Sequence, residues 1–183
     1  MKKVAVFGNT GAGKSTLSKQ IADLTRLPLY ALDQLQYQPG GAEVSHQDYQ
    51  QAHQRILEQD QWIIDGFGSI DTLWIRLNTA DTLVFIDLPL YLHFWWVTKR
   101  FLISGVKPPE GYPKNSPMFK STMTSYRVLW LCHQRLTPRY REFVEQARST
   151  KQVYHLRSPK QIAQFLDKQR KVHHDPIYES KAN

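Results

Sequence analysis

Gly8-Asn9-Thr10-Gly11-Ala12-Gly13-Lys14-Ser15 is the stretch that decides the fold. It has the form GxxxxGKS, follows an apolar run at 3–7 and precedes a segment, 15–24, whose apolar residues recur at helical spacing. In this setting the glycines let backbone N–H groups enclose phosphates, and the positive end of the helix adds to the attraction. We expect Lys14 to reach the β- and γ-phosphates of a nucleotide and Ser15 to offer its hydroxyl to Mg²⁺. The expected phosphate-binding residues are Gly8, Asn9, Thr10, Gly11, Ala12, Gly13, Lys14, Ser15 and Thr16.

Further short apolar runs alternate with segments of helical spacing along the rest of the chain. This alternation predicts an α/β layered fold with a mostly parallel sheet. The runs expected to form strands are residues 3–7, 28–32, 61–64, 82–86 and 152–156, and the expected helices are residues 15–24, 47–59, 90–102 and 159–168.

The composition suits one intracellular domain. The chain has 183 residues, of which 41% are hydrophobic and 22% charged, and this excludes a mostly disordered chain. Cys132 is the only cysteine in the sequence, so no internal disulfide can form, and we expect a cytoplasmic protein. The most apolar stretch, 82–103, is interrupted by Asp87, Pro89 and Lys99, which makes it a poor membrane span. We therefore expect no membrane partner.

The positive charge of the chain is concentrated in its second half. Residues 1–90 carry 7 Lys and Arg against 10 Asp and Glu, a net charge of −3, whereas residues 91–183 carry 17 against 6, a net charge of +11. Such a half is typical of a nucleic-acid surface, of a solvated face or of arginines gathered around phosphates.

Four arginines follow a Pro-rich segment in this basic half. Arg127 and Arg135 are eight residues apart, near one face of a helix, and we favour them as phosphate contacts delivered by a closing lid. For Arg139 and Arg141, a phosphate site and a solvated face are equally open interpretations.

Two aspartates follow predicted strands: Asp65 comes after the third and Asp87 after the fourth. Ligands of α/β proteins bind where the carboxyl ends of parallel strands meet, so either carboxylate could complete a magnesium shell with Ser15. We prefer Asp65, because Gly66 lets the backbone approach a ligand closely. The alternative interpretation of Asp87 is a helix cap.

With these motifs in place, the sequence resembles the P-loop kinases of the nucleoside monophosphate kinase group. Within that group it is most similar to the adenylate-kinase-related family of DNA topology modulation proteins. The likeness covers about residues 3–167, nearly the whole chain. The resembling segments are VFGNTGAGKSTLSKQIA, LDQLQYQPG, WIIDGF, RLNTAD followed by TLVFIDLP, the Lys99-Arg100 pair, and HLRSPKQIAQFL.

The resemblance implies a three-layer P-loop NTPase sandwich. Its five-stranded parallel sheet would have the order 2-3-1-4-5, with helices on both faces and a helical lid. It implies a single kinase-like domain over residues 1–169, with an acceptor-binding segment at about 33–61 and a lid at about 99–141. The polar residues 170–183 are expected to form a loosely ordered tail.

The resemblance also implies roles for single residues. Asp65 matches the aspartate that lies near Mg²⁺, and Asp33 matches the acidic residue on the acceptor side. Arg100, which precedes the lid, would lie near the donor nucleotide. Arg157, at the last strand-to-helix turn, would lie near the base of that nucleotide.

One departure from the family pattern concerns the acceptor. Adenylate kinases continue Asp-Gly-Phe with Pro-Arg, and that arginine grips the acceptor phosphate, whereas this chain continues with Gly68-Ser69. Arg76 is the nearest substitute. Asp33 could orient or deprotonate an acceptor hydroxyl. If the acceptor is already a phosphate, Asp33 would instead contact a sugar or base, and a turn or cap aspartate is the structural alternative.

The leading hypothesis is ATP- and Mg²⁺-dependent phosphoryl transfer to a nucleotide or another small molecule. Lys14, Arg100, Arg127 and Arg135 would stabilise the transferring group. The alternatives are a nucleotide-binding protein with only weak ATPase activity and a nucleotide-gated nucleic-acid-binding protein. The sequence carries no helix-turn-helix, zinc-finger or RNA-binding signature, which argues against direct DNA binding. Both a monomer and a dimer fit the sequence.

Overall fold

A parallel β-sheet forms the centre of the molecule. The computed structural model describes residues 1–36, 44–104 and 118–173. Within this part of the chain, strands pair in the order β2-β3-β1-β4-β5, and every pairing is parallel, which confirms the predicted fold class and strand order. The strands are β1 (Lys3–Gly8), β2 (Leu29–Ala31), β3 (Trp62–Asp65), β4 (Thr82–Ile86) and β5 (Gln152–Leu156).

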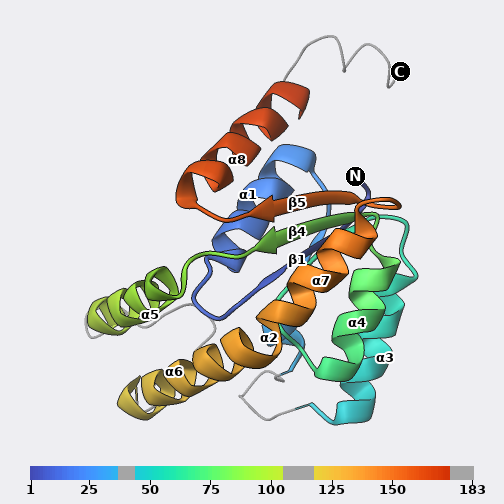
Figure 1. Ribbon diagram of the computed structural model, residues 1–183. Coiled ribbons are helices and arrows are strands. Elements are labelled where there is room, and N and C mark those ends of the chain that lie inside the picture. Colours follow the sequence, from blue (N-terminus) through green and yellow to red (C-terminus); the bar gives the residue numbers. More distant parts are fainter. Residues whose placement is uncertain (37–43, 105–117, 174–183) are drawn as a thin grey trace.

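Helices cover both faces of the sheet, as Figure 1 shows. Successive side chains of a strand point to opposite faces, so β1 contributes Val4 and Val6 to one apolar core and Ala5 and Phe7 to the other. α1 and α8 pack over the first core, and α3, α4 and α7 over the second. These helices are α1 (Lys14–Thr25), α3 (His46–Leu57), α4 (Ile70–Thr79), α7 (Thr137–Ala147) and α8 (Pro159–His173).

α5 (Leu90–Ser104) and α6 (Met118–Arg135) project together from the carboxyl edge of the sheet (Figure 1). Residues 105–117, the centre of the expected lid, lie outside the described residues. The end of the expected lid, residue 141, falls inside α7, whose Tyr140 is buried against the sheet. The beginning of α7 is therefore part of the layered body.

Four helices are absent from those predicted by the spacing of apolar residues: α2 (Leu32–Leu35), α4, α6 and α7. α6 contains Arg127 and Arg135, which were expected near one face of a helix in the lid. Two of the four helices carry start signals that spacing overlooks. Ser69 and Thr72 form a capping box that begins α4, and a proline in the first turn begins α7. At the other end of the chain, α8 continues to His173, so residues 170–173 are helical, in contrast to the expected tail. Residues 174–183 lie outside the described residues.

None of the helices in the described part of the chain is long and apolar enough to cross a membrane.

Candidate functional site

The GxxxxGKS loop connects β1 to α1 at the centre of the carboxyl edge of the sheet. Gly8 has a φ of +146°, and a side chain there would collide with the backbone carbonyl of Ile86. Gly13, with a φ of +77°, caps α1 without a side-chain hydrogen bond, so the first N–H groups of the helix point into the loop. The Nζ of Lys14 donates to the carbonyl oxygen of Asn9 at 3.0 Å. These are the backbone features expected of a phosphate-binding loop.

α5 and α6 hold the phosphate loop from outside. The ring nitrogens of buried His93, on α5, lie 3.0 Å from the carbonyl oxygen of Thr10 and 3.2 Å from that of Leu88. Asn9 donates from Nδ2 to the carbonyl oxygen of Leu129, on α6, at 3.0 Å. This role of His93 was not predicted, because nothing in an aromatic-rich helix indicates which side chain will face a loop 83 residues earlier.

Asp33 and Asp65 lie together at the ends of β2 and β3. Ala31 pairs with Asp65 across the two strands, and Asp33 follows in the first turn of α2. Gly66 has a φ of +106°, and a Cβ atom there would lie 3.0 Å from Asp33 Oδ1, so the glycine keeps the carboxylate close to the backbone. Desolvation raises the pKa of Asp33, with a further contribution from Asp65, although the charge of Lys14 opposes the rise. Lys14 and Asp65 therefore both act electrostatically on Asp33.

The Asp65 side chain is 2% exposed, and its Oδ1 has no hydrogen-bond partner among the described residues. An unpaired buried carboxylate oxygen is costly unless something binds it. Mg²⁺ and its water shell prefer oxygen ligands, so Asp65 and the exposed hydroxyl of Ser15 fit such an ion. Among the described residues, no group of three or more His, Cys, Asp or Glu side chains could enclose a metal by itself.

Arg76 occupies a position that sequence analysis did not foresee. Its side chain is completely buried, and Nη2 donates to the carbonyl oxygen of Gly66 at 3.0 Å and to that of Phe67 at 3.5 Å. Nε and Nη1 are buried and have no partner among the described residues. Burial lowers the pKa of Arg76, although an arginine remains protonated in proteins, and Asp65 and Asp33 oppose the shift. The guanidinium of Arg76 thus binds the backbone of the loop after Asp65 and is not presented at the surface.

His53 is a second buried basic residue near the loop after Asp65, since the charge of Arg76 acts on it. His53, on α3, is 2% exposed, and its ring stacks with Tyr49 at a centroid distance of 6.3 Å. Burial lowers the pKa of His53 to about 4, and the positive charge of Arg76 adds to the effect. His53 is therefore neutral near pH 7. A Cβ atom on Gly68 would overlap the hydroxyl of Tyr49, so the absence of a side chain at Gly68 makes room for Tyr49.

Asp87, the other strand-end aspartate, is engaged in a network of side chains. Arg141, on α7, donates to both of its oxygens, from Nε at 2.8 Å and from Nη2 at 2.9 Å. His155, on β5, donates from Nε2 to Oδ2 at 2.8 Å. Burial alone would raise the pKa of Asp87, but the hydrogen bonds from His155 and Arg141 outweigh it and lower the pKa to about 2. Both oxygens of Asp87 are therefore engaged by side chains, and the half-exposed guanidinium of Arg141 is paired with this carboxylate.

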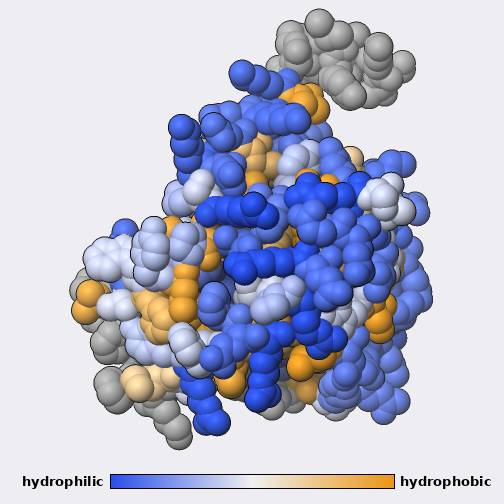
Figure 2. Space-filling model, in the orientation of Figure 1, coloured by the Kyte–Doolittle hydropathy of each residue, from blue (hydrophilic) through white to orange (hydrophobic). Residues whose placement is uncertain are grey.

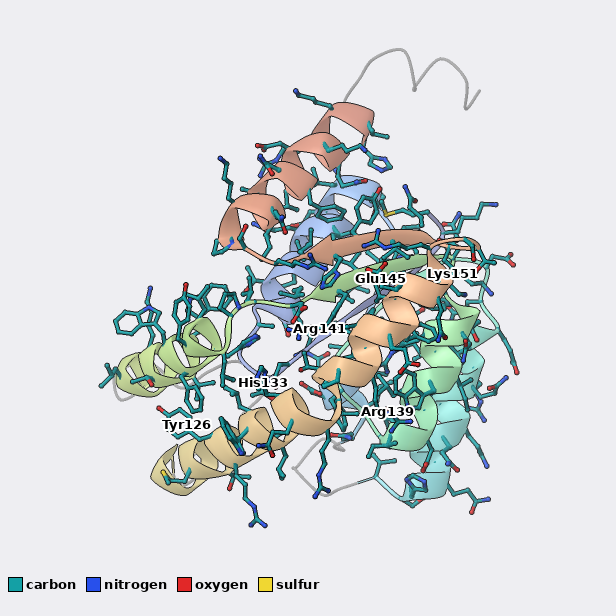
Figure 3. All side chains as sticks on the ribbon, in the orientation of Figure 1. Tyr126, His133, Arg139, Arg141, Glu145 and Lys151 are labelled. Carbon is teal, nitrogen blue, oxygen red and sulfur yellow. The ribbon has the colours of Figure 1, made fainter. Side chains whose placement is uncertain are left out.

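A cavity of about 430 Å³ opens beside this network. Arg157, expected near the base of a nucleotide, lies on its rim and contacts His155 through Nη2 at 3.2 Å from Nδ1. Figure 3 shows Arg141 and His133 on the sides of α7 and α6 that face the carboxyl ends of the strands. The residues that line the cavity are Asp87, Leu88, Pro89, Leu90, His133, Arg141 and Arg157.

The arginines expected to serve a lid lie in different surroundings. Arg127 and Arg135 are exposed on α6. Arg139 packs over the ring of Trp74 with its guanidinium carbon 5.1 Å from the ring centroid, so it is a surface contact of α7. Arg100 belongs to α5, but its side chain lies outside the described part of the chain.

Comparison of the fold with solved structures finds kinases. A shikimate kinase from Acinetobacter baumannii, solved with shikimate, matches with a TM-score of 0.57 and 12% identity over 100% of this chain and 96% of that one. A shikimate kinase from Bacteroides thetaiotaomicron matches with a TM-score of 0.54 and 14% identity over 92% and 96%. The fold is that of the P-loop kinases. At these identities the likeness establishes the fold alone.

No protein-family model matches the sequence. No curated protein matches it either.

Proposed function

We propose that the protein is an ATP- and Mg²⁺-dependent kinase that phosphorylates a hydroxyl group of a small molecule or nucleotide. One observation carries the proposal: the P-loop lysine, Asp33 and Asp65 converge at the carboxyl edge of β1, β2 and β3. Phosphoryl transfer needs a cradle for the donor phosphates, an ion that neutralises them and a group that orients the attacking hydroxyl. Lys14, Asp65 and Asp33 correspond to these three requirements.

On the donor side, the loop from Gly8 to Thr16 would hold the phosphates of ATP, with Lys14 reaching the transferring group. Ser15 and Asp65 would hold Mg²⁺, with Asp65 acting through a bound water. The ion would neutralise charge on the phosphate oxygens. Arg157 would lie near the base. Arg100, Arg127 and Arg135 would supply further positive charge from α5 and α6 on closure.

On the acceptor side, Asp33 would orient the hydroxyl and accept its proton. A raised pKa makes a carboxylate a stronger base, which suits this role. We assign Arg76 as a positioning residue, since it acts on the acceptor only through the Gly66 and Phe67 carbonyls that it binds. A guanidinium with no exposed surface is unsuited to gripping an acceptor phosphate, and this favours a hydroxyl acceptor.

The finer placement of the chain is also part of this proposal. The motif likeness to the adenylate-kinase-related DNA topology modulation proteins suggests that lineage. The fold likeness to shikimate kinases suggests a small hydroxylated acceptor. Both suggestions agree on the phosphate loop and differ on the acceptor, which an assay can decide.

The test is ATP turnover with Mg²⁺ against a panel of nucleosides, nucleoside monophosphates and small hydroxylated metabolites. The proposal expects one compound to raise ADP release far above background and to become phosphorylated itself. ATP binding with no response to any compound would favour a nucleotide-binding protein with weak ATPase activity. Duplex DNA binding that weakens steeply with salt would favour the nucleic-acid alternative.

Lys14→Ala should lower turnover at least about 100-fold, because it removes the charge that stabilises the transferring phosphoryl group. Steady-state ADP release measures the change, and thermal unfolding checks that the variant is folded. Lys168→Ala, at an exposed position of α8, is the matched control and should leave turnover unchanged. Equal turnover in Lys14→Ala and the wild type would exclude the kinase assignment.

A further inference from the structure

α5 and α6 form an arm that extends beyond the sheet on the carboxyl side (Figure 1). The two helices are joined along an inner seam, where Thr98 Oγ1 lies 2.6 Å from the hydroxyl of Tyr126 and the rings of Phe94 and Tyr126 are 5.5 Å apart. Val97 and Leu129 are buried where the arm meets the phosphate loop. Leu92 and Trp96 of α5 also pack against one core, and Cys132 of α6 packs against the other. The sides of the two helices that carry exposed residues are called here the outer faces of the arm.

These outer faces carry most of the large apolar side chains that are exposed in the described part of the chain. Seven of the 11 such residues belong to the two helices. On α5, Tyr91, Trp95 and Leu102 recur at four and seven residues, so they form one stripe, and their exposed fractions are 69%, 59% and 66%. Scattered apolar residues are normal on a surface, but a contiguous stripe marks an interaction site. We define the arm surface as Tyr91, Trp95 and Leu102 of α5 with Met123, Trp130 and Leu131 of α6.

The charge of the arm has one sign. Neither helical segment contains an Asp or Glu in its sequence, and exposed Lys99, Arg127 and Arg135 stand among the apolar residues. By contrast, α7 and α8, which are also at the surface, contain acidic residues. In Figure 2, orange and pale residues gather over α5 and α6 at the lower left, whereas the region of α8 at the top is mostly blue. A second copy of the arm would bring two positive surfaces together, so the charge favours an anionic partner.

We propose that the arm surface binds peripherally to a bilayer that contains anionic lipids. Tryptophan, tyrosine and leucine favour the region between headgroups and acyl chains, and basic residues beside them are attracted to anionic headgroups. Burial of the non-aromatic side chains of Leu102, Met123 and Leu131 in acyl chains would strengthen binding to a bilayer. A single-stranded nucleic acid would instead bind through stacking of its bases on the aromatic residues alone. Peripheral binding needs no spanning helix, in keeping with the absence of one from the described residues. The sequence-based expectation of no membrane partner considered spanning segments only.

The test is co-sedimentation of the full chain with vesicles of two parts phosphatidylcholine to one part phosphatidylglycerol, compared with phosphatidylcholine alone. The anionic vesicles should bind at least about tenfold more protein, and added salt should weaken the binding. Tyr91→Ser with Trp95→Ser should abolish most of the binding, and Lys99→Glu should lower it about tenfold. Ile70→Ser with Ile75→Ser removes two exposed apolar residues of α4, away from the arm, and should bind as the wild type does.

Equal loss of binding in the arm variant and in the α4 control would overturn the proposal, as would equal binding to both kinds of vesicle. A dimer in analytical ultracentrifugation that Trp95→Ser dissociates, without vesicle binding, would assign the surface to a second copy. Binding of a single-stranded oligonucleotide in place of vesicles would assign it to nucleic acid. Thermal unfolding verifies that each variant is folded. ATP turnover in solution should be unaffected by Tyr91→Ser and Trp95→Ser, so a failure here is independent of the kinase proposal.

Discussion

Asp65 and Asp87 occupy equivalent places on either side of β1, yet their surroundings differ. Each ends or follows a completely buried strand, one on β3 and the other after β4, and both strands pair with β1. Both carboxylates are largely buried, at 2% and 8% exposed. Asp87 has both oxygens engaged by Arg141 and His155, whereas Asp65 keeps a buried oxygen without a partner among the described residues.

Both residues are aspartates at the end of a buried strand, and the hydrogen bonds that each one makes distinguish a structural role from a ligand-binding role. An aspartate whose bonds are complete stabilises the fold, and its environment holds the pKa of Asp87 at about 2. An aspartate with an unsatisfied buried oxygen retains capacity for a ligand. We therefore expect variants at Asp65 to change activity and variants at Asp87 to change stability.

Asp65→Asn should have the largest effect. It removes the negative charge proposed to hold magnesium while keeping the shape of the side chain, so turnover should fall roughly 100-fold or more. The free energy of unfolding should change by less than about 1 kcal/mol, since Oδ1 has no partner to lose. Magnesium titration of ATP turnover and urea denaturation measure the two quantities. A variant with full activity and reduced stability would make Asp65 a structural residue like Asp87.

As the pH falls, protonation of His53, which lies behind the loop after Asp65, should destabilise the protein before Asp87 becomes protonated. The pKa of His53 is about 4 in the folded protein and 6.5 as its ordinary value, so the unfolded chain binds a proton more readily between these two pH values. Stability is therefore complete above pH 6.5 and falls by about 2–3 kcal/mol as the pH approaches 4. Urea denaturation at several pH values measures this slope. His53→Gln should reduce the slope over this range, and an unchanged slope would assign the acid response to other groups.

Asp87→Asn should have a smaller effect, and on stability alone. The variant loses charge-assisted bonds to Arg141 and His155, but Arg141 is half-exposed and can be rehydrated, so we expect a loss of about 2 kcal/mol. The advantage of the wild type should disappear as the pH falls from 3.8 to 2, where Asp87 becomes protonated. Urea denaturation at several pH values measures both effects. Arg148→Gln breaks the exposed pair with Glu145 and, as a control, should cost less than about 0.5 kcal/mol. Loss of turnover per folded molecule in Asp87→Asn would contradict the division between the two aspartates.

The strands and the position of the GxxxxGKS loop between β1 and α1 could be predicted because their signals are local. Buried parallel strands are short apolar runs, and all five were found within about two residues of their ends. The loop combines glycines at the positions of unusual φ with a lysine and serine at the helix start. The strand order came from the motif likeness, because the order of pairing depends on contacts between distant segments.

The burial of Arg76 and the pairing of Arg141 could not be predicted from local signals. Both arginines lie on helices that sequence spacing missed, α4 and α7. Arg76 was expected to contact the acceptor, and the structure places it beneath the loop at Gly66. Arg141 meets Asp87, which is 54 residues away in the chain. Part of the positive charge of the second half is therefore the partner of a buried carboxylate, because Arg141 pairs with Asp87.

By itself the sequence determined a parallel α/β protein with a GxxxxGKS loop between its first strand and first helix, since periodicity and glycine placement act over neighbouring residues. Tertiary structure alone decided which aspartate has its bonds completed and which arginine is buried, and it left one face of α5 and α6 exposed. These outcomes depend on which distant side chains meet once the sheet and helices have packed. Hydrogen-bond satisfaction and desolvation are properties of that packing, and no local stretch of sequence contains them.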